Sequence, residues 1–186
     1  MSRQNVYNIR RGDIVNKSII PNTMTLGNLI CGVLSIQCTI YQDFTTAGIF
    51  ILLGGILDRY DGTVARFLNT HSDLGKELDS LADLVTFGVA PAILAFSLYN
   101  FSSLGLFGYI PLIVFPVAGG FRLARYNCSD FNNVFTGIPI TIAGSLMAVL
   151  EIFTAVKIKT IPLLVPFVLM LLLSYLMISH FHIKKR

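Results

Sequence analysis

The sequence predicts an all-α integral membrane protein, a bundle of six transmembrane helices with both termini in the cytoplasm. Three observations predict it. The 186 residues are 54% hydrophobic and only 13% charged, with a mean hydropathy of +0.70, whereas an average soluble domain is about 25% charged. Long stretches such as residues 84–121 contain no charge at all. The Lys and Arg residues gather at the ends of the apolar stretches, as is typical of membrane proteins.

The first two helices are expected over residues 22–41 and 46–67, because a membrane-spanning helix needs about 20 mostly apolar residues. Gln42 and Asp43 mark the turn between them. The second helix is unusual because charged residues stand near its end, from position 58 onward.

The third helix is expected to begin near Gly75, and the fourth to end at Arg122 and Arg125, with a break at residues 100–103. The fifth and sixth helices are expected over residues 137–156 and 160–181. The resulting organisation has an N-terminal tail over residues 1–18, one membrane domain over residues 19–183 and a basic tail over residues 184–186.

The distribution of positive charge predicts the orientation in the cell membrane. With both termini in the cytoplasm, every Lys and Arg except Lys157 and Lys159, 12 of 14, lies on the cytoplasmic side, as the positive-inside rule favours. Basic loops facing an anionic leaflet also explain the net charge of +4 without a nucleic-acid partner. The basic N-terminal tail is then either an amphipathic helix on that leaflet or disordered. Glu151 is expected as a loop charge near Lys157 on the outer side.

Four aspartates provide the chemistry that the sequence predicts. On a helix, Asp58 and Asp61 share a face because they are three residues apart, and Asp79 and Asp83 share one because they are four apart. Two adjacent antiparallel helices would aim all four carboxylates at one point, where unpaired charges repel and lose hydration. An all-oxygen set suits Mg²⁺, Mn²⁺ or Ca²⁺, and a pair of such cations suits displacement at phosphorus.

Residues around the aspartates fit a phosphate ligand. Gly54, Gly62 and Ala65 form a stripe of small residues along the second helix, which would let a ligand or a facing helix approach closely. Arg66 has the planar fork that binds phosphate, and Ser72 has a hydroxyl donor.

A structural alternative stays open for the same residues. The aspartates would then be interfacial charges paired with Arg59, Arg66 and Lys76. His180 and His182 are expected as interfacial residues near the end of the sixth helix.

The acidic pattern resembles the signature of a known family at every position. It reads Asp58-x2-Asp61-Gly62-x2-Ala65-Arg66-x8-Gly75-x3-Asp79-x3-Asp83, and it is similar to that of the CDP-alcohol phosphotransferase family. Residues 21–28, 78–91, 122–127 and 137–139 resemble the phosphatidylserine synthase branch of that family. The resemblance covers about residues 19–182.

The resemblance implies a six-helix membrane enzyme, usually a homodimer, that transfers the phosphatidyl group of CDP-diacylglycerol to an alcohol and releases CMP. It implies two divalent cations, Mg²⁺ or Mn²⁺ with Ca²⁺ as a non-productive occupant, held by Asp58, Asp61, Asp79 and Asp83. Asp83 would also be the general base on the acceptor hydroxyl. The residues that it places around the CDP-lipid are Pro21, Asn22, Thr23, Gly62, Ala65, Arg66, Ser72 and Gly75.

The branch implies L-serine as the acceptor. Its carboxylate calls for a bidentate arginine, which Arg122 or Arg125 would supply, although both also fit positive-inside anchoring. Asn28 fits a helix-packing amide as well as a contact with serine.

Two other functions stay open. A sister enzyme would use glycerol 3-phosphate or an inositol phosphate, but the glycerophosphate branch typically has Pro and Lys where this chain has Ser80 and Leu84. A cation transporter would use the four carboxylates as an ion path. That function needs polar groups across the membrane, and residues 84–121 offer no charge.

Overall fold

The computed structural model describes residues 3–67, 73–128, 134–156, 161–179 and 182–184, and among these it describes residues 3–21, 64–67, 73, 134–136 and 182–184 by their backbone alone. Helices α1 (Arg3–Ile40) and α2 (Phe44–Phe67) form a hairpin. The helical segments that follow are α3 (Asp73–Asp83), η1 (Leu84–Val89), α4 (Ala90–Leu98), η2 (Phe101–Gly108), α5 (Tyr109–Cys128), α6 (Ile140–Ala155) and α7 (Leu164–Ile178). Two short strands, β1 (Val134–Thr136) and β2 (His182–Lys184), pair in antiparallel fashion.

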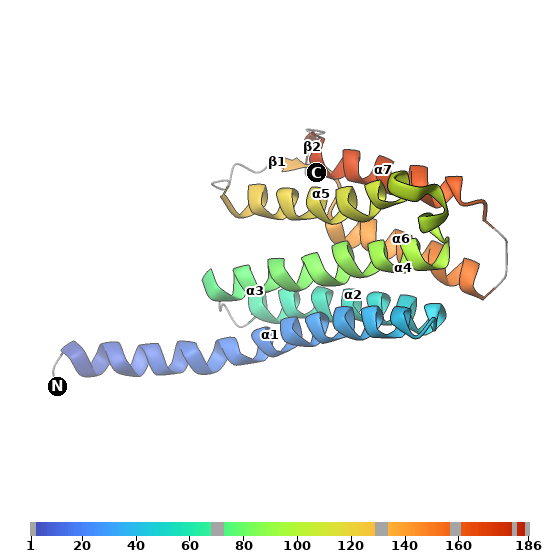
Figure 1. The fold of residues 1–186 in the computed structure, drawn as a ribbon. Helices are drawn as coiled ribbons and strands as arrows, with labels where there is room; N and C mark the ends of the chain where they lie inside the picture. The colour runs from blue at the N-terminus through green and yellow to red at the C-terminus, as the bar shows by residue number, and fades with distance from the viewer. Residues whose placement is uncertain (1–2, 68–72, 129–133, 157–160, 180–181, 185–186) are drawn as a thin grey trace.

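The turn between α1 and α2 falls where the sequence predicts it. Gln42 has a positive φ of 64°, and Asp43 caps α2 because its Oδ1 accepts the backbone N–H of Thr46 at 3.1 Å. Hydrogen bonds from the side chain and the backbone of Thr46 lower the pKa of the Asp43 carboxyl. The chain therefore reverses within the three residues between Ile40 and Phe44, which places α2 beside the C-terminal half of α1 (Figure 1).

Segments α3, η1 and α4 run on as one rod, in which η1 is a turn of π-helix directly after Asp83. The rod ends at Leu98, and Asn100 then has a positive φ of 50°. The chain bends again at Gly105 inside η2, where φ is 59°. The end of the rod at Leu98 and the turn at Asn100 confirm the predicted break at residues 100–103.

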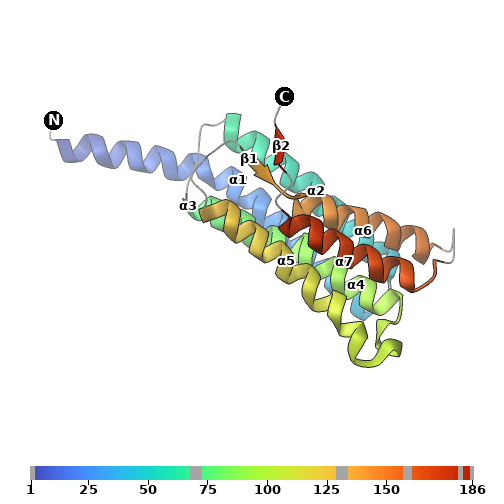
Figure 2. The same cartoon turned by 90° about the horizontal axis from the view of Figure 1, so that it is seen from above.

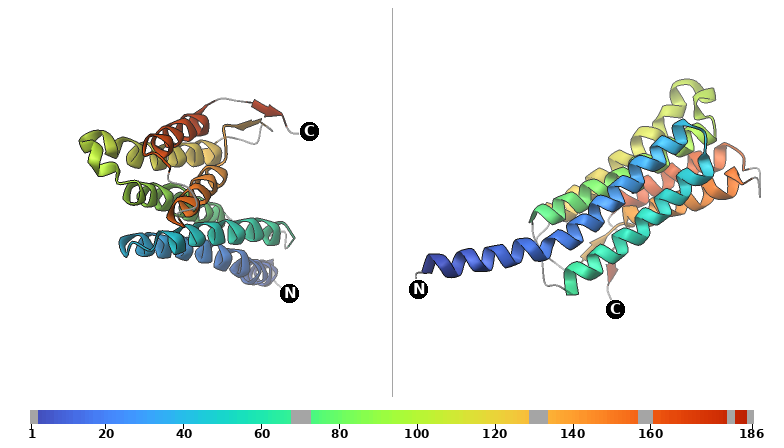
Figure 3. Two further views of the ribbon diagram at one scale, coloured as in Figure 1. Left: turned by 90° about the vertical axis from the view of Figure 1, so that its right-hand side faces the viewer. Right: turned by 90° about the horizontal axis from the view of Figure 1, so that it is seen from below.

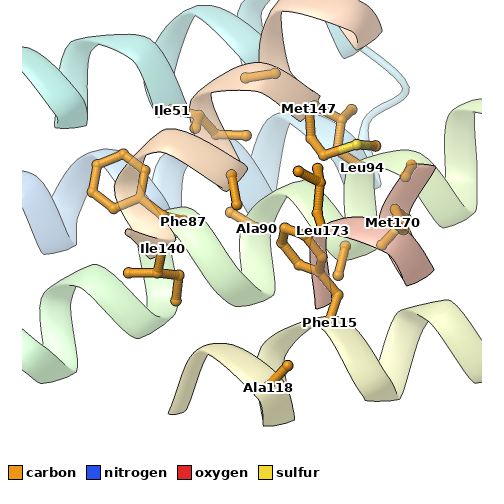
Figure 4. Packing of buried hydrophobic residues seen from close by; sticks show 14 of the residues in the cluster. Ile51, Phe87, Ala90, Leu94, Phe115, Ala118, Ile140, Met147, Met170 and Leu173 are labelled. Carbon is orange, nitrogen blue, oxygen red and sulfur yellow. The ribbon is translucent and has the colours of Figure 1, made fainter. Parts of the chain in front are cut away.

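The helices pack in layers. Figure 3 shows α1 and α2 on one side of the bundle and α5 and α7 on the other, with α4 and α6 between them. The central layer holds the core, in which Phe87, Leu94 and Met147 are fully buried (Figure 4). The middle of the rod thus touches both outer layers and fixes the position of the acidic segment that precedes it.

Three stretches of the described residues are long and apolar enough to cross a membrane, namely Asn22–Ile40, Leu74–Leu98 and Phe101–Cys128. Helices α6 and α7 are apolar but shorter, with 16 and 15 residues. Along α5, Ile113, Val117 and Phe121 lie one turn apart and are each more than half exposed, an apolar ridge that suits contact with lipid. An all-helical bundle with apolar spans is confirmed, and six spans with cytoplasmic termini stay a prediction.

One end of the bundle gathers segments that are distant in sequence. The strand pair β1–β2 lies there, next to the ends of α5 and α7 (Figure 2). Gly137 has a φ of 78°, and a Cβ at this residue would run into the backbone carbonyls of Leu176 and Met177. The next residue, Ile138, donates its N–H to the Leu176 carbonyl at 3.2 Å. This glycine turn therefore docks the start of α6 onto the end of α7.

Two details were not anticipated. Helix α1 begins at Arg3 and continues through residue 18 without a break, so its first part projects beyond the bundle (Figure 1). The expectation that Glu151 is a loop charge is wrong, because it lies inside α6 with no exposed surface. The predicted helix over residues 137–156 already contains Glu151, but its burial comes from packing of α6 against neighbouring helices, which the local sequence does not show. Lys157, its expected neighbour, lies outside the described residues.

Candidate active site

Three of the predicted aspartates come together between α2 and α3. Asp58 and Asp61 on α2 and Asp79 on α3 each offer a carboxylate oxygen within 4.8 Å of the other two. Asp61 is buried and the other two are half-buried. The helical spacing of three residues on α2 thus produces the convergence that the sequence predicts.

Asp83 is the last of the four predicted aspartates along the chain and, like Asp61, is buried. It lies one turn after Asp79, only 7% of it is exposed, and its Oδ1 accepts a hydrogen bond from Asn28 Nδ2 on α1 at 3.2 Å. Its carboxyl is close enough to Asp58 and Asp79 to interact with them electrostatically. Among the described residues, three carboxyls therefore converge, and the Asp83 carboxyl lies beside them.

The donor set fits a divalent cation. Oδ1 of Asp79 is buried and has no hydrogen-bond partner among the described residues, which is costly for a carboxylate unless a cation or a proton joins it. All available ligand atoms are carboxylate oxygens, the kind that Mg²⁺ and Mn²⁺ prefer.

Two basic side chains would pair with the aspartates if these were only interfacial charges, but both have other neighbours. Lys76 Nζ donates to the Asn127 carbonyl at 3.1 Å and lies 5.9 Å from the centre of the Tyr126 ring. Arg59 lines a groove on the opposite side of α2. These contacts favour a ligand site over a set of structural ion pairs.

Thr25 on α1 and Thr86 on η1 are polar residues near the site that the sequence analysis did not single out. Thr25 Oγ1 donates to Asp61 Oδ2 at 2.8 Å, and Thr86 Oγ1 donates to the backbone carbonyl of Asn28 at 2.9 Å. All three of these α1 and η1 residues are buried. The available signal was the spacing of Thr25 and Asn28, three residues apart on one face of an apolar helix.

The two predicted acceptor arginines have different surroundings. Arg125 donates from its Nη1 to the Ile178 carbonyl at 3.0 Å, which ties the end of α5 to the end of α7. Arg122 is half-buried, its Nε is buried without a hydrogen-bond partner among the described residues, and its charge is close enough to interact with Asp83. Arg122 is therefore within electrostatic reach of the acidic site.

A groove of about 460 Å³ runs along the far side of α2, toward α6. Its apolar part is lined by Leu52, Gly55 and Ile56, and its polar end by Arg59, Tyr60 and Thr63, next to the aspartates in sequence. Thr141 and Ser145 contribute from α6. A surface that is apolar at one end and cationic at the other suits an acidic amphiphile.

Comparison with known proteins agrees with this geometry. Residues 18–183, nearly the whole chain, match the family described as CDP-alcohol phosphatidyltransferase. The chain belongs to this family. The four aspartates, Gly62, Ala65, Arg66 and Gly75 all lie inside the matched region.

Three similar proteins from different organisms bear the name CDP-diacylglycerol–serine O-phosphatidyltransferase. The protein from Bacillus subtilis is 42% identical over 133 residues, which cover 71% of this chain and 75% of the relative. That from Helicobacter pylori is 38% identical over 69% of this chain and 55% of the relative. That from Methanocaldococcus jannaschii is 40% identical over 70% and 58%. The matched segment is thus somewhat more than half of the last two relatives.

The structure describes some of the residues predicted around the CDP-lipid in full and others only by their backbone. Gly62 and Gly75 are half-buried on α2 and α3 beside the aspartates, and a Cβ added at Gly62 would meet nothing within 4 Å. Pro21, Ala65 and Arg66 are described only as backbone positions on α1 and α2, and Ser72 lies outside the described residues. Asn22 is half-buried and Thr23 is exposed, both in α1 one or two turns before Asn28.

Proposed function

We propose that this protein is a phosphatidylserine synthase, which transfers the phosphatidyl group of CDP-diacylglycerol to the hydroxyl of L-serine and releases CMP. The observation that carries this proposal is the convergence of Asp58, Asp61 and Asp79 in a chain whose relatives from Bacillus subtilis, Helicobacter pylori and Methanocaldococcus jannaschii bear the serine transferase name. Ser80 and Leu84, which replace the Pro and Lys typical of the glycerophosphate branch, support serine over glycerol 3-phosphate.

Asp58, Asp61, Asp79 and Asp83 are the residues that would hold divalent cations, Mg²⁺ or Mn²⁺, and Asp79 Oδ1 is the oxygen most in need of one. When bound, such cations polarise the diphosphate and neutralise the charge that develops on departing CMP. By holding the cations, the aspartates would place the diphosphate between α2 and α3. Gly62 leaves room for the nucleotide, since no described atom lies within 4 Å of where its Cβ would be.

Asp83 is the proposed general base. The serine hydroxyl oxygen attacks the β-phosphorus, the bond from that phosphorus to the CMP oxygen breaks, and the hydroxyl proton passes to the Asp83 carboxylate. The burial of Asp83 keeps bulk water from competing with serine for the phosphorus. Asp83 follows Asp79 by one turn of α3 and interacts with Asp58, so the proton acceptor would lie next to the cation ligands.

The substrates reach this site from different directions. The lipid chains enter sideways from the bilayer between the helices, while the diphosphate lies at the aspartates between α2 and α3. Serine enters from the cytoplasm, and its carboxylate pairs with Arg122. We further propose that six helical rods span the cell membrane, namely α1, α2, the α3–η1–α4 rod, η2 with α5, α6 and α7. Both termini would then face the cytoplasm, and the enzyme would be a homodimer.

The test is CMP release by the purified protein with CDP-diacylglycerol, Mn²⁺ or Mg²⁺, and a panel of alcohols. We expect release with L-serine and little with glycerol 3-phosphate or inositol phosphate. Release with glycerol 3-phosphate but not with serine would show that the acceptor is wrong. Ion flux in proteoliposomes without any CMP release would instead favour the transporter.

A further inference from the structure

Two hydrogen-bond donors lie one turn apart on α1 and face two different acidic helices. Thr25 Oγ1 donates to Asp61 on α2 at 2.8 Å, and Asn28 Nδ2 donates to Asp83 on α3 at 3.2 Å. Thr25 is 5% exposed and Asn28 is fully buried. The first helix therefore holds one carboxylate from each side of the site, although α1 carries no acidic residue of that site itself.

Asn28 is itself held in place by close packing. Thr86 Oγ1 donates to its backbone carbonyl at 2.9 Å. A Cβ at Gly54 on α2 would come within 2.8 Å of Asn28 Oδ1 and 2.6 Å of Thr86 Cγ2, and one at Gly32 would come within 2.9 Å of Thr86 Cα. Two glycines thus allow α1, α2 and η1 to enclose the carboxamide, which leaves it little freedom to turn away from Asp83.

Fixed donors matter where several carboxylates meet. The acidic groups repel one another, so each would rotate away from its neighbours unless a partner held it. A charge-assisted hydrogen bond restricts that rotation, and partners of metal ligands typically change metal affinity or activity by about 10–100-fold when they are removed.

We propose that Thr25 and Asn28 are positioning residues, which fix Asp61 for cation binding and Asp83 for proton removal from the acceptor hydroxyl. The proposal rests on the proposed function, because it assigns these roles within the same phosphatidyl transfer. It assigns Asn28 to Asp83 and removes it from the residues that touch serine.

The first experiment measures Mn²⁺ binding to the purified protein without substrate, by electron paramagnetic resonance. Thr25→Val is expected to weaken binding by about tenfold or more, and Thr25→Ser to restore it, since Ser keeps the hydroxyl. Thr39→Val is the matched control, because Thr39 is also buried on α1 but donates to the Ser35 carbonyl of its own helix. Equal Mn²⁺ affinities for Thr25→Val and Thr39→Val would overturn the role of Thr25.

The second experiment compares kcat with KM for serine in Asn28→Leu and Asn28→Ser, the latter being a smaller change in case Leu prevents folding. We expect kcat to fall at least tenfold and KM to change less than threefold, about the size of effect that misplaced catalytic groups produce. A raised KM with unchanged kcat would make Asn28 a serine contact and overturn the proposal. If the wild type releases no CMP with any alcohol, the proposed function fails, while the Mn²⁺ titration of Thr25→Val still tests the positioning role.

Discussion

Asn127, in the last turn of α5, donates a side-chain hydrogen bond to Ser80 on α3, with 2.9 Å between Nδ2 and Oγ. Lys76 Nζ strengthens the same contact by donating to the Asn127 backbone carbonyl at 3.1 Å. Ser80 directly follows Asp79, so this contact fixes the acidic turn of α3 against α5. The proline typical of the glycerophosphate branch would have no hydroxyl to offer at this position.

Loss of this contact is expected to lower stability. Ser80→Ala and Asn127→Ala should each reduce the free energy of unfolding by about 1 kcal/mol, the usual net value of one hydrogen bond. The double variant should lose less than the sum, because both single changes remove the same bond. Unfolding of the detergent-solubilised protein measures all three, and strictly additive losses would contradict the coupling.

Two glycines on α2 should respond differently to the same substitution. Gly54→Ala is expected to destabilise the protein by about 1–3 kcal/mol, because its Cβ would overlap Asn28 and Thr86. Gly62→Ala should not lower the unfolding midpoint, because its Cβ meets no described atom within 4 Å beyond its own helix turn and chain neighbours, and Ala favours a helix over Gly by about 1 kcal/mol. It should instead raise KM for CDP-diacylglycerol, where that Cβ would intrude on the nucleotide. An unchanged KM in Gly62→Ala would remove Gly62 from the nucleotide site.

The two arginines of α5 should separate binding from stability. Arg122→Ala is expected to raise KM for serine by about tenfold or more, since a lost charge-assisted pair costs about 1.5–3 kcal/mol. Arg125→Ala should mainly lower the unfolding midpoint, because Arg125 Nη1 bonds the Ile178 carbonyl at the end of α7. Serine kinetics and thermal unfolding of both variants check this, and the reverse pattern would exchange their roles.

The aspartates should differ in what their loss abolishes. Asp58→Ala is expected to eliminate the metal-dependent release of CMP, and excess chelator should do the same to the wild type. Asp83→Asn should abolish transfer because an amide does not accept the serine proton. CMP release measured in the presence of serine tests each case. Full activity in Asp83→Asn would exclude it as the base, and wild-type turnover in excess chelator would exclude the metal.

Glu151 should be replaceable by an apolar residue of similar size. It is fully buried in α6, and neither carboxyl oxygen has a hydrogen-bond partner among the described residues. Removing such a group should raise the free energy of unfolding by about 1–3 kcal/mol in Glu151→Met, with a smaller gain in Glu151→Gln, which keeps a polar group. A loss of stability in Glu151→Met would indicate a polar partner outside the described residues.

Much of the helix order was predictable because charged residues and turn residues interrupt the apolar sequence at the helix ends. Asp43 and Asn100 mark the reversals of the chain, and both lie where the sequence indicates a turn. The pairs Asp58–Asp61 and Asp79–Asp83 were found by helical spacing alone, and three of the four carboxyls meet as expected.

What the sequence did not predict depends on contacts between helices. Nothing in the local pattern shows that Thr25 reaches Asp61, because 36 residues separate them. Glu151 looked like a boundary charge since its burial comes from neighbouring helices. The strands β1 and β2 pair only because α5 and α7 end side by side, a tertiary relationship that three-residue segments cannot reveal.

The π-helical turn η1 gives the rod of α3, η1 and α4 a fixed angular phase. An α-helix advances about 100° per residue, whereas a π-helical turn, bonded from i to i+5, accommodates one more residue. Asp79 and Asp83 precede η1, and Ala90 and Leu94 follow it in the core. Deleting one residue inside η1 would turn it into ordinary α-helix and leave the acidic end facing nearly the same way, whereas a deletion between Asp79 and η1 would swing Asp79 about 100° around the axis. The π-helical turn is therefore the part of the rod where a change in residue number disturbs the direction of the carboxylates least.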